Sequence, residues 1–184
     1  NISNGNVLVM LILSMIASII LGMGLPTSAC YIILAVLTAP ALIEAGVEPF
    51  AAHYFIFFFG CISTITPPVA LSAYAGAGIA GANPMKTGWT AFRLGLVGYI
   101  IPYMVVFEPS IVLLGTWQKT VITTIFIVIG VIALTYANEG YKKTKLSTLD
   151  RAIFFVAAVL IFIQGYTWTD ITGVIIVGLM LLKL

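Results

Sequence analysis

The sequence predicts an all-α protein that lies in a membrane and crosses it several times. Three observations predict this fold class. Apolar residues make up 61% of the 184 residues and charged residues only 8%, whereas a soluble domain has roughly 45–50% apolar and about 25% charged residues. With 8 basic and 6 acidic residues, the chain cannot give a globule a polar surface, so we expect lipid to cover much of it. The apolar residues also form long runs, as transmembrane helices do.

Eight apolar segments follow one another along the chain. Their approximate bounds are 7–23, 27–43, 50–65, 69–82, 90–107, 120–137, 152–166 and 171–184. A simple crossing needs about 20 apolar residues, and we expect the fifth and sixth segments to be simple crossings. The first four form two pairs, each interrupted by Gly and Pro. Each pair can be a re-entrant hairpin that returns to its own side, or one crossing with an unwound middle.

The distribution of charge favours one topology. Basic residues near the ends of a crossing favour the cytoplasmic side, and four of them lie in the stretch 138–151: Lys142, Lys143, Lys145 and Arg151. With that loop inside, the turn at 44–49 lies outside, where it carries two glutamates and no basic residue. The first pair of segments then forms a hairpin that enters from outside, and the second pair forms one broken helix.

The predicted organisation has four parts. They are a hairpin plus broken helix (1–82), two transmembrane helices (83–137), a basic cytoplasmic loop (138–151) and a C-terminal helical pair (152–184). Because the chain starts at Asn1 and ends inside an apolar run, we expect it to be the C-terminal part of a longer protein. We expect the inner membrane as its location.

The first break is the sequence Gly-Met-Gly-Leu-Pro-Thr-Ser at 22–28. Gly22 and Gly24 allow unusual backbone angles and close approach, and Pro26 suits the first turn of the next helix. Thr27 and Ser28 place hydroxyls at that helix N-terminus, whose partial positive charge favours a carboxylate.

The second break is the sequence Ser-Thr-Ile-Thr-Pro-Pro-Val at 63–69. Pro67 and Pro68 stop the helix and leave carbonyls one turn back without their usual donors. Ser63, Thr64 and Thr66 add hydroxyl oxygens, which hard cations prefer as ligands. The candidate sodium ligands are Gly22, Gly24, Ser63, Thr64 and Thr66.

Two breaks so close in sequence predict a shared binding site. Unwound backbone within a membrane is tolerated only where protein buries it or where it lines a cavity, and secondary transporters bind ions and anionic groups at such half-helix ends. The alternative is that each break is a kink that neighbouring helices repair. For His53, the one histidine, we expect a hydrogen-bonded or interfacial role, and for Cys30 and Cys61 the role of small buried apolar residues.

Other classes of function find little support in the sequence. The net charge of +2 is too small to indicate a nucleic-acid partner, and the sequence has neither a Walker loop nor a cluster of metal ligands. We therefore expect no enzymatic activity and no cofactor other than sodium as a coupling ion. A non-transporting membrane scaffold or assembly subunit remains the alternative to a transporter.

Five motifs resemble the large membrane subunit of tripartite ATP-independent periplasmic (TRAP) transporters. They are GMGLPTSA at 22–29, APAL at 39–42, AAH at 51–53, ITPPVAL at 65–71 and AGIAGANPMKTG at 77–88. The most similar variant is the fused 4TM/12TM permease, whose partners are TAXI-type binding proteins. The resemblance covers 7–110 well and 111–184 loosely.

The resemblance implies a function and a set of site residues. A periplasmic binding protein would deliver a small, often carboxylate-bearing solute, and a sodium gradient would drive its import by an elevator-like movement. The chain would hold the second of two inverted repeats, with the first repeat in a missing N-terminal part of the same permease. Carried over, 22–28 matches the hairpin tip and 65–69 the loop of the broken helix.

Overall fold

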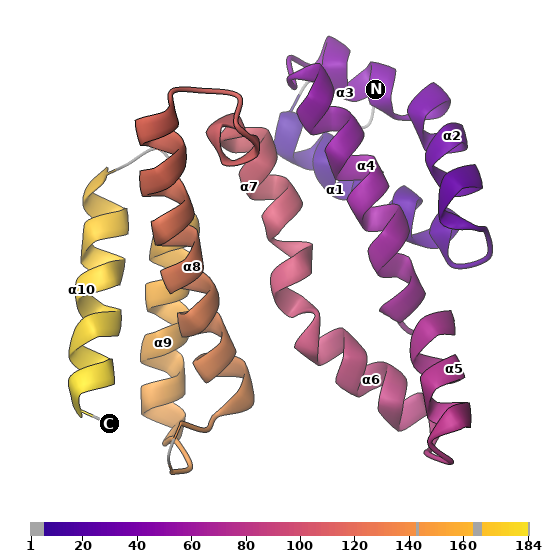
Figure 1. Ribbon diagram of the computed structural model, residues 1–184. Helices are drawn as coiled ribbons and strands as arrows, with labels where there is room; N and C mark the ends of the chain where they lie inside the picture. The colour runs from indigo at the N-terminus through magenta and orange to yellow at the C-terminus, as the bar shows by residue number, and fades with distance from the viewer. Residues whose placement is uncertain (1–5, 143, 164–166, 184) are drawn as a thin grey trace. The chain divides into compact units, whose positions relative to one another are not determined.

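The computed structural model describes residues 6–142, 144–163 and 167–183, and every regular element in them is helical (Figure 1). The predicted all-α class is therefore confirmed. The chain divides into two compact units, Asn1–Val106 and Phe107–Leu184.

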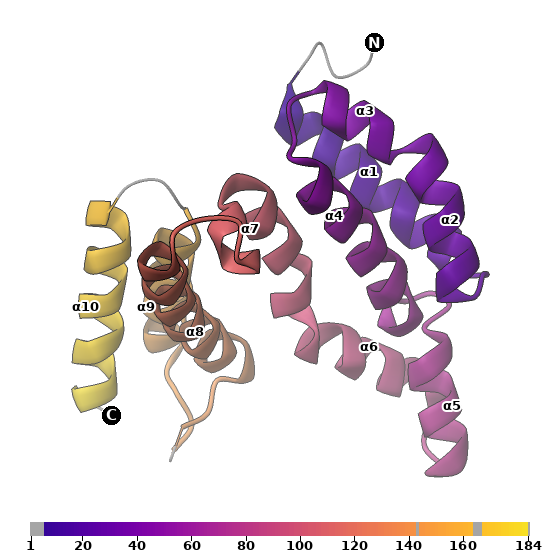
Figure 2. The same cartoon turned by 45° about the horizontal axis from the view of Figure 1, so that its top comes forward.

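The first unit holds the two breaks. Its elements are α1 (Val7–Gly22), α2 (Thr27–Leu37), α3 (Ala39–Glu44), α4 (Pro49–Ile62), the 3₁₀ turn η1 (Ser63–Ile65), α5 (Leu71–Ile79), α6 (Pro84–Leu94), the 3₁₀ turn η2 (Leu96–Tyr99) and α7 (Ile101–Phe107). Helices α1 and α2 run antiparallel and both pack on α4 (Figure 2).

Polar residues at the helix starts set the limits of the first unit's helices. The Asn6 side chain accepts hydrogen bonds from the first backbone N–H groups of α1. Glu48 does the same for α4, where its carboxylate accepts from the Ala51 N–H at 2.8 Å. The core between these helices is largely apolar, and its fully buried large side chains include Leu11, Leu34, Phe55 and Phe59. Burial of these side chains stabilises the α1–α2–α4 packing.

Two predicted segments differ from the structure. The segment 27–43 is two helices, because Pro40 has no N–H to continue α2 and the chain turns at Thr38. The prediction of a simple crossing at 90–107 is wrong, because this segment is bent and not one straight helix. Helix α6 already begins at Pro84, and the pair formed by α6 and η2–α7 is bent by 59°. Pro102 in α7 again removes a backbone donor.

Helix length gives modest support to membrane crossing. Among the described residues, α8 (Trp117–Glu139) is the one helix that is long and apolar enough to cross alone, and the bent α6–α7 pair would be a second crossing. The number of crossings beyond these stays a prediction.

The second unit is a bundle of three helices. It consists of the 3₁₀ turn η3 (Pro109–Val112) followed by α8, α9 (Thr148–Phe162) and α10 (Thr167–Lys183). Glycines let the helices approach closely: a Cβ at Gly130 in α8 would lie 3.0 Å from a methyl of Ile161, and a Cβ at Gly173 in α10 would lie 2.9 Å from the Ala157 carbonyl oxygen. The ends of the last two predicted segments, 164–166 and 184, lie outside the described residues.

Basic side chains hold one end of this bundle together. Arg151 Nε donates to the Ala137 carbonyl at 2.8 Å, at the C-terminal end of α8. Lys142 Nζ donates to the Leu181 carbonyl at 2.7 Å, near the end of α10. Cations and donors at these helix ends satisfy carbonyls that have no partner within the helix. The predicted basic loop is thus a structural clamp as well as a topology signal; Lys143 lies outside the described residues.

Acidification should weaken this end of the bundle. Asp150 accepts hydrogen bonds from Ser147 (2.7 Å) and pairs with Lys183 (3.0 Å), and these contacts lower the Asp150 pKa from 3.8. Because the Asp150 carboxylate is favoured in the folded protein, it stabilises the folded state above pH 3.8. That contribution is lost as the pH falls through the lowered pKa of the folded state. We expect the melting temperature of the purified protein to exceed that of Asp150→Asn at pH 7, and the difference to shrink at pH 3. An equal difference at both pH values would contradict this role.

Candidate functional site

One face of α1 is polar and buried. Ser14, Ser18 and Gly22 recur at helical spacing and are all buried in the first unit. The Ser18 hydroxyl donates to the Ser14 carbonyl at 2.7 Å, and the Cys30 thiol of α2 lies 4.0 Å from the Ser18 carbonyl oxygen. This face extends to the C-terminal end of α1, where the first break begins.

The two breaks meet at Gly22 and Ser63. A Cβ at Gly22 would lie 2.8 Å from the Gly60 carbonyl oxygen and would collide with the Ser63 hydroxyl. Only a residue without a side chain permits this approach. The last residue of α1 therefore packs directly on the last turn of α4, where the second break begins.

The hydroxyls of the second break face their own helix. Ser63 donates to the Gly60 carbonyl (2.6 Å), Thr64 to the Cys61 carbonyl (2.9 Å) and Thr66 to the Ile62 carbonyl (2.7 Å). These bonds satisfy the donors, as expected for a repaired kink. Each hydroxyl oxygen also has lone pairs, so the break presents several neutral oxygens from a buried backbone. Ser63 and Thr66 are buried and Thr64 is half-buried.

The backbone after η1 is irregular. The Thr66 N–H bonds the Ser63 carbonyl at 3.1 Å, and Pro68 has no N–H to bond the carbonyl four residues back. Ala70, just before α5, has a left-handed φ of 38°, a conformation that disfavours a residue with a Cβ. The Tyr74 hydroxyl donates to the Pro68 carbonyl at 2.7 Å and so ties α5 back to the break. The helix therefore continues as a 3₁₀ turn through Ile65, and of the predicted break at 63–69 the part from Thr66 onward is irregular.

Four other residues of the first break face away from the protein interior. Gly24, Pro26, Thr27 and Ser28 are exposed, and a Cβ at Gly24 would meet nothing within 4 Å. The N-terminus of α2 has no side-chain cap. Within the described residues, no hydrogen bond joins Thr27 or Ser28 to the second break. Of the predicted site residues, the structure brings Gly22 to Ser63, and a role for the others stays a prediction.

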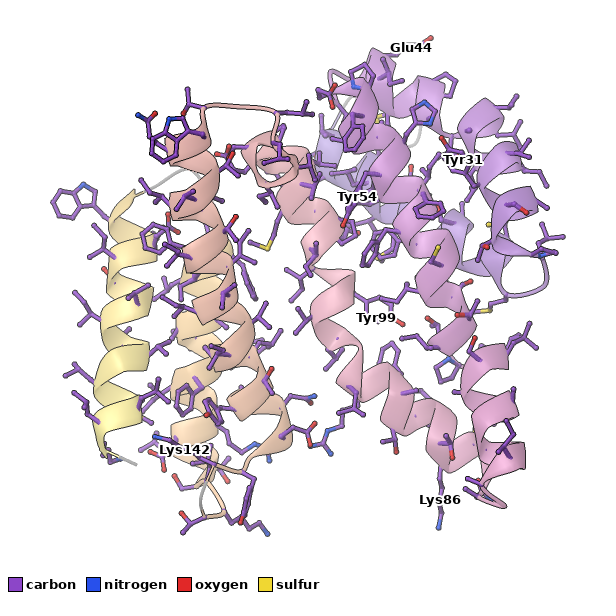
Figure 3. All side chains as sticks on the ribbon, viewed as in Figure 1. Tyr31, Glu44, Tyr54, Lys86, Tyr99 and Lys142 are labelled. Carbon is purple, nitrogen blue, oxygen red and sulfur yellow. The ribbon has the colours of Figure 1, made fainter. Side chains whose placement is uncertain are left out.

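Tyr99 is a site residue that the sequence did not predict. Its hydroxyl lies 2.5 Å from the Thr66 hydroxyl oxygen, and Figure 3 shows the Tyr99 side chain pointing from the α6–α7 bend toward α4. The sequence signals this region weakly: Gly95, Gly98 and Pro102 lie inside an apolar run and permit a bend without requiring one.

His53 and the cysteines have structural environments. The Tyr31 hydroxyl lies 3.1 Å from His53 Nδ1, so the predicted hydrogen-bonded histidine is confirmed. Cys30 is buried, as predicted, and Cys61 is half-buried; both are free. In the part of the chain that the structure describes, no three His, Cys, Asp or Glu side chains gather to hold a metal ion.

Comparison with known protein families finds a match, and the matched residues include the candidate site. The family described as "Tripartite ATP-independent periplasmic transporter, DctM component" matches residues 1–120, which include both breaks and the α6–α7 bend. No curated protein and no solved structure matches the chain.

Proposed function

The chain belongs to the DctM component family of tripartite ATP-independent periplasmic transporters, and from that premise we propose that it imports a small carboxylate-bearing solute together with sodium. It is thus a membrane component of a transporter, in a family of transporters rather than enzymes. The observation that carries the proposal is the contact between Gly22 and Ser63, since it joins the two breaks at one place.

Helix lengths support a hairpin and a broken helix. Helix α1 has 16 residues and α2 has 11, so at 1.5 Å per residue neither exceeds about 24 Å. The hydrocarbon core is about 30 Å thick. Both arms are therefore too short to cross alone and suit a re-entrant hairpin, while α4, η1 and α5 together suit one interrupted crossing.

The chemistry of the second break favours sodium over protons. Its polar atoms are hydroxyl and carbonyl oxygens, which are hard neutral ligands. Neither break contains Asp, Glu or His, the groups that usually carry protons in membrane transporters. Buried oxygens around Gly22, Ser63 and Thr66 can replace the water of a sodium ion without a buried counter-charge.

The α2 N-terminus is the proposed site of the solute carboxylate. Thr27 and Ser28 are exposed there, and the first backbone N–H groups of α2 have no side-chain cap. Unpaired N–H groups and the helix dipole attract an anion. The proposed carboxylate site and the proposed sodium site thus belong to different breaks, and Gly22 is the residue of the first break that contacts the second.

The family implies partner subunits, such as a periplasmic binding protein. We propose a TAXI-type binding protein as that partner and a multi-pass location in the inner membrane. We also propose that the first inverted repeat belongs to the same permease and completes the path. The resemblance of the sequence motifs to fused permeases supports all three proposals.

Binding of radioactive sodium to the purified permease in choline chloride buffer tests the proposed coupling ion. We expect saturable binding that unlabelled sodium displaces and choline does not. Absence of saturable binding would favour the alternative, a scaffold subunit whose breaks are packing kinks.

A further inference from the structure

The α6–α7 bend packs on the second break through two glycines. A Cβ at Gly95 would lie 2.8 Å from the Ile65 side chain, and a Cβ at Gly98 would lie 2.6 Å from the Ile62 side chain. A side chain at either position would force the facing isoleucine to shift, so these glycines allow η2 to lie close to the end of α4. The bend at the 3₁₀ turn η2 thus lies against the proposed ion site, and Tyr99 is its polar contact.

The direction of the Tyr99 hydrogen bond follows from counting protons. The Thr66 hydroxyl oxygen lies 2.7 Å from the Ile62 carbonyl oxygen and 2.5 Å from the Tyr99 hydroxyl oxygen. The carbonyl can only accept, so the single hydroxyl proton of Thr66 goes to Ile62. Tyr99 must then donate its proton to Thr66. This leaves one lone pair on the Thr66 oxygen.

A cation on that lone pair would oppose the Tyr99 hydrogen bond. Coordination draws electron density from the Thr66 oxygen, which makes it a weaker acceptor. Two interactions that compete for one oxygen weaken each other by equal free energies. We propose that Tyr99 tunes the sodium site: its hydroxyl competes with sodium for the Thr66 oxygen and ties the bend to the break, so sodium binding loosens that tie. The inference rests on the proposed sodium site.

The ring of Tyr99 has a separate role in packing. Its centroid lies 5.2 Å from that of Phe92 and 6.3 Å from that of Phe59. Tyr99→Phe keeps this ring and removes only the donor. Tyr103→Phe is the matched control, because the Tyr103 hydroxyl contacts the Met15 sulfur at 3.2 Å, and its ring also packs on Phe59.

Radioactive sodium binding to the purified permease tests the inference. We expect Tyr99→Phe to bind sodium up to about fivefold more tightly, because loss of one hydrogen bond removes the competitor, and Tyr103→Phe to match the wild type. Replacement of Tyr99 by 3-fluorotyrosine strengthens the donor and should weaken sodium binding. This near-isosteric replacement keeps the test decisive if Tyr99→Phe does not fold.

The outcomes separate the two claims. Wild-type protein that binds no sodium would contradict the proposed coupling ion itself, and the inference with it. Sodium binding in the wild type with unchanged or weaker binding in Tyr99→Phe, or unchanged binding with 3-fluorotyrosine, would overturn the role of Tyr99 alone.

Discussion

Gly22→Ala should weaken sodium binding to the permease by about tenfold or more and lower its stability by roughly 1–3 kcal/mol. The new Cβ would lie 2.8 Å from the Gly60 carbonyl oxygen, which belongs to the backbone of α4, and would collide with the Ser63 hydroxyl. Ser63 cannot turn away freely, because it donates to that same carbonyl. The two breaks must therefore separate to admit one methyl group.

Gly24→Ala is the matched control for this effect. The same methyl at Gly24, two residues along the chain, would meet nothing within 4 Å. We expect wild-type sodium binding and an unchanged melting temperature, because the methyl meets no atom and leaves the Gly24 backbone carbonyl in place. In an ordinary helix Gly→Ala stabilises by about 1 kcal/mol. A lower stability of Gly22→Ala would therefore be due to the steric clash of the new methyl and not to helix propensity. Equal behaviour of both variants would contradict the contact between the breaks.

Thr66→Val should abolish saturable sodium binding in the accessible concentration range, or weaken it by at least about tenfold. The substitution keeps the branched shape but removes the oxygen that lies between the Ile62 carbonyl and the Tyr99 hydroxyl. Two partners of the Thr66 hydroxyl lose their hydrogen bond, which costs about 1–3 kcal/mol of stability for a buried group.

Thr124→Val controls for loss of a threonine hydroxyl within a helix. Thr124 donates to the Thr120 carbonyl at 2.7 Å in α8, the same type of bond that Thr66 makes to Ile62. We expect this variant to bind sodium as the wild type does. A Thr66→Val protein with wild-type affinity would remove Thr66 from the ion site, and the inferred role of Tyr99 with it.

Composition and breakers predicted much of the fold and part of the site. The apolar excess of the chain indicated membrane helices, and Pro67 and Pro68 lie in the break between η1 and α5, as expected of residues without an N–H. Residues that lack an N–H or a Cβ act locally, so their effect is visible in the sequence. The same reasoning predicted a break at 22–28, where the structure has the turn between α1 and α2.

Contacts between distant residues could not be predicted in this way. The 59° bend between α6 and α7 arises where Gly95 and Gly98 pack on Ile65 and Ile62, some 30 residues away. A run of apolar residues with two glycines is equally typical of a straight transmembrane helix. The role of Tyr99 was not predicted for the same reason, because its partner Thr66 follows η1 and lies 33 residues away along the chain.

The clamp in the second unit is a further case. Lys142 was interpreted from its charge alone, whereas its ammonium group caps the end of α10 at Leu181. The Leu181 carbonyl is 39 residues away along the chain, and nothing in the local pattern marks it as an acceptor. The charges of the loop 138–151 predicted its side of the membrane, but the groups that these charges contact depend on how the helices pack.

A structure of the purified permease, determined once in sodium chloride and once in choline chloride, tests the central claim most directly. We predict that Gly22 packs against Gly60 and Ser63, and that sodium adds density within coordination distance of the hydroxyl oxygens of the second break. Gly22 and Ser63 lying apart in both conditions, or no difference at the break between the two salts, would contradict a sodium site built where the two breaks meet.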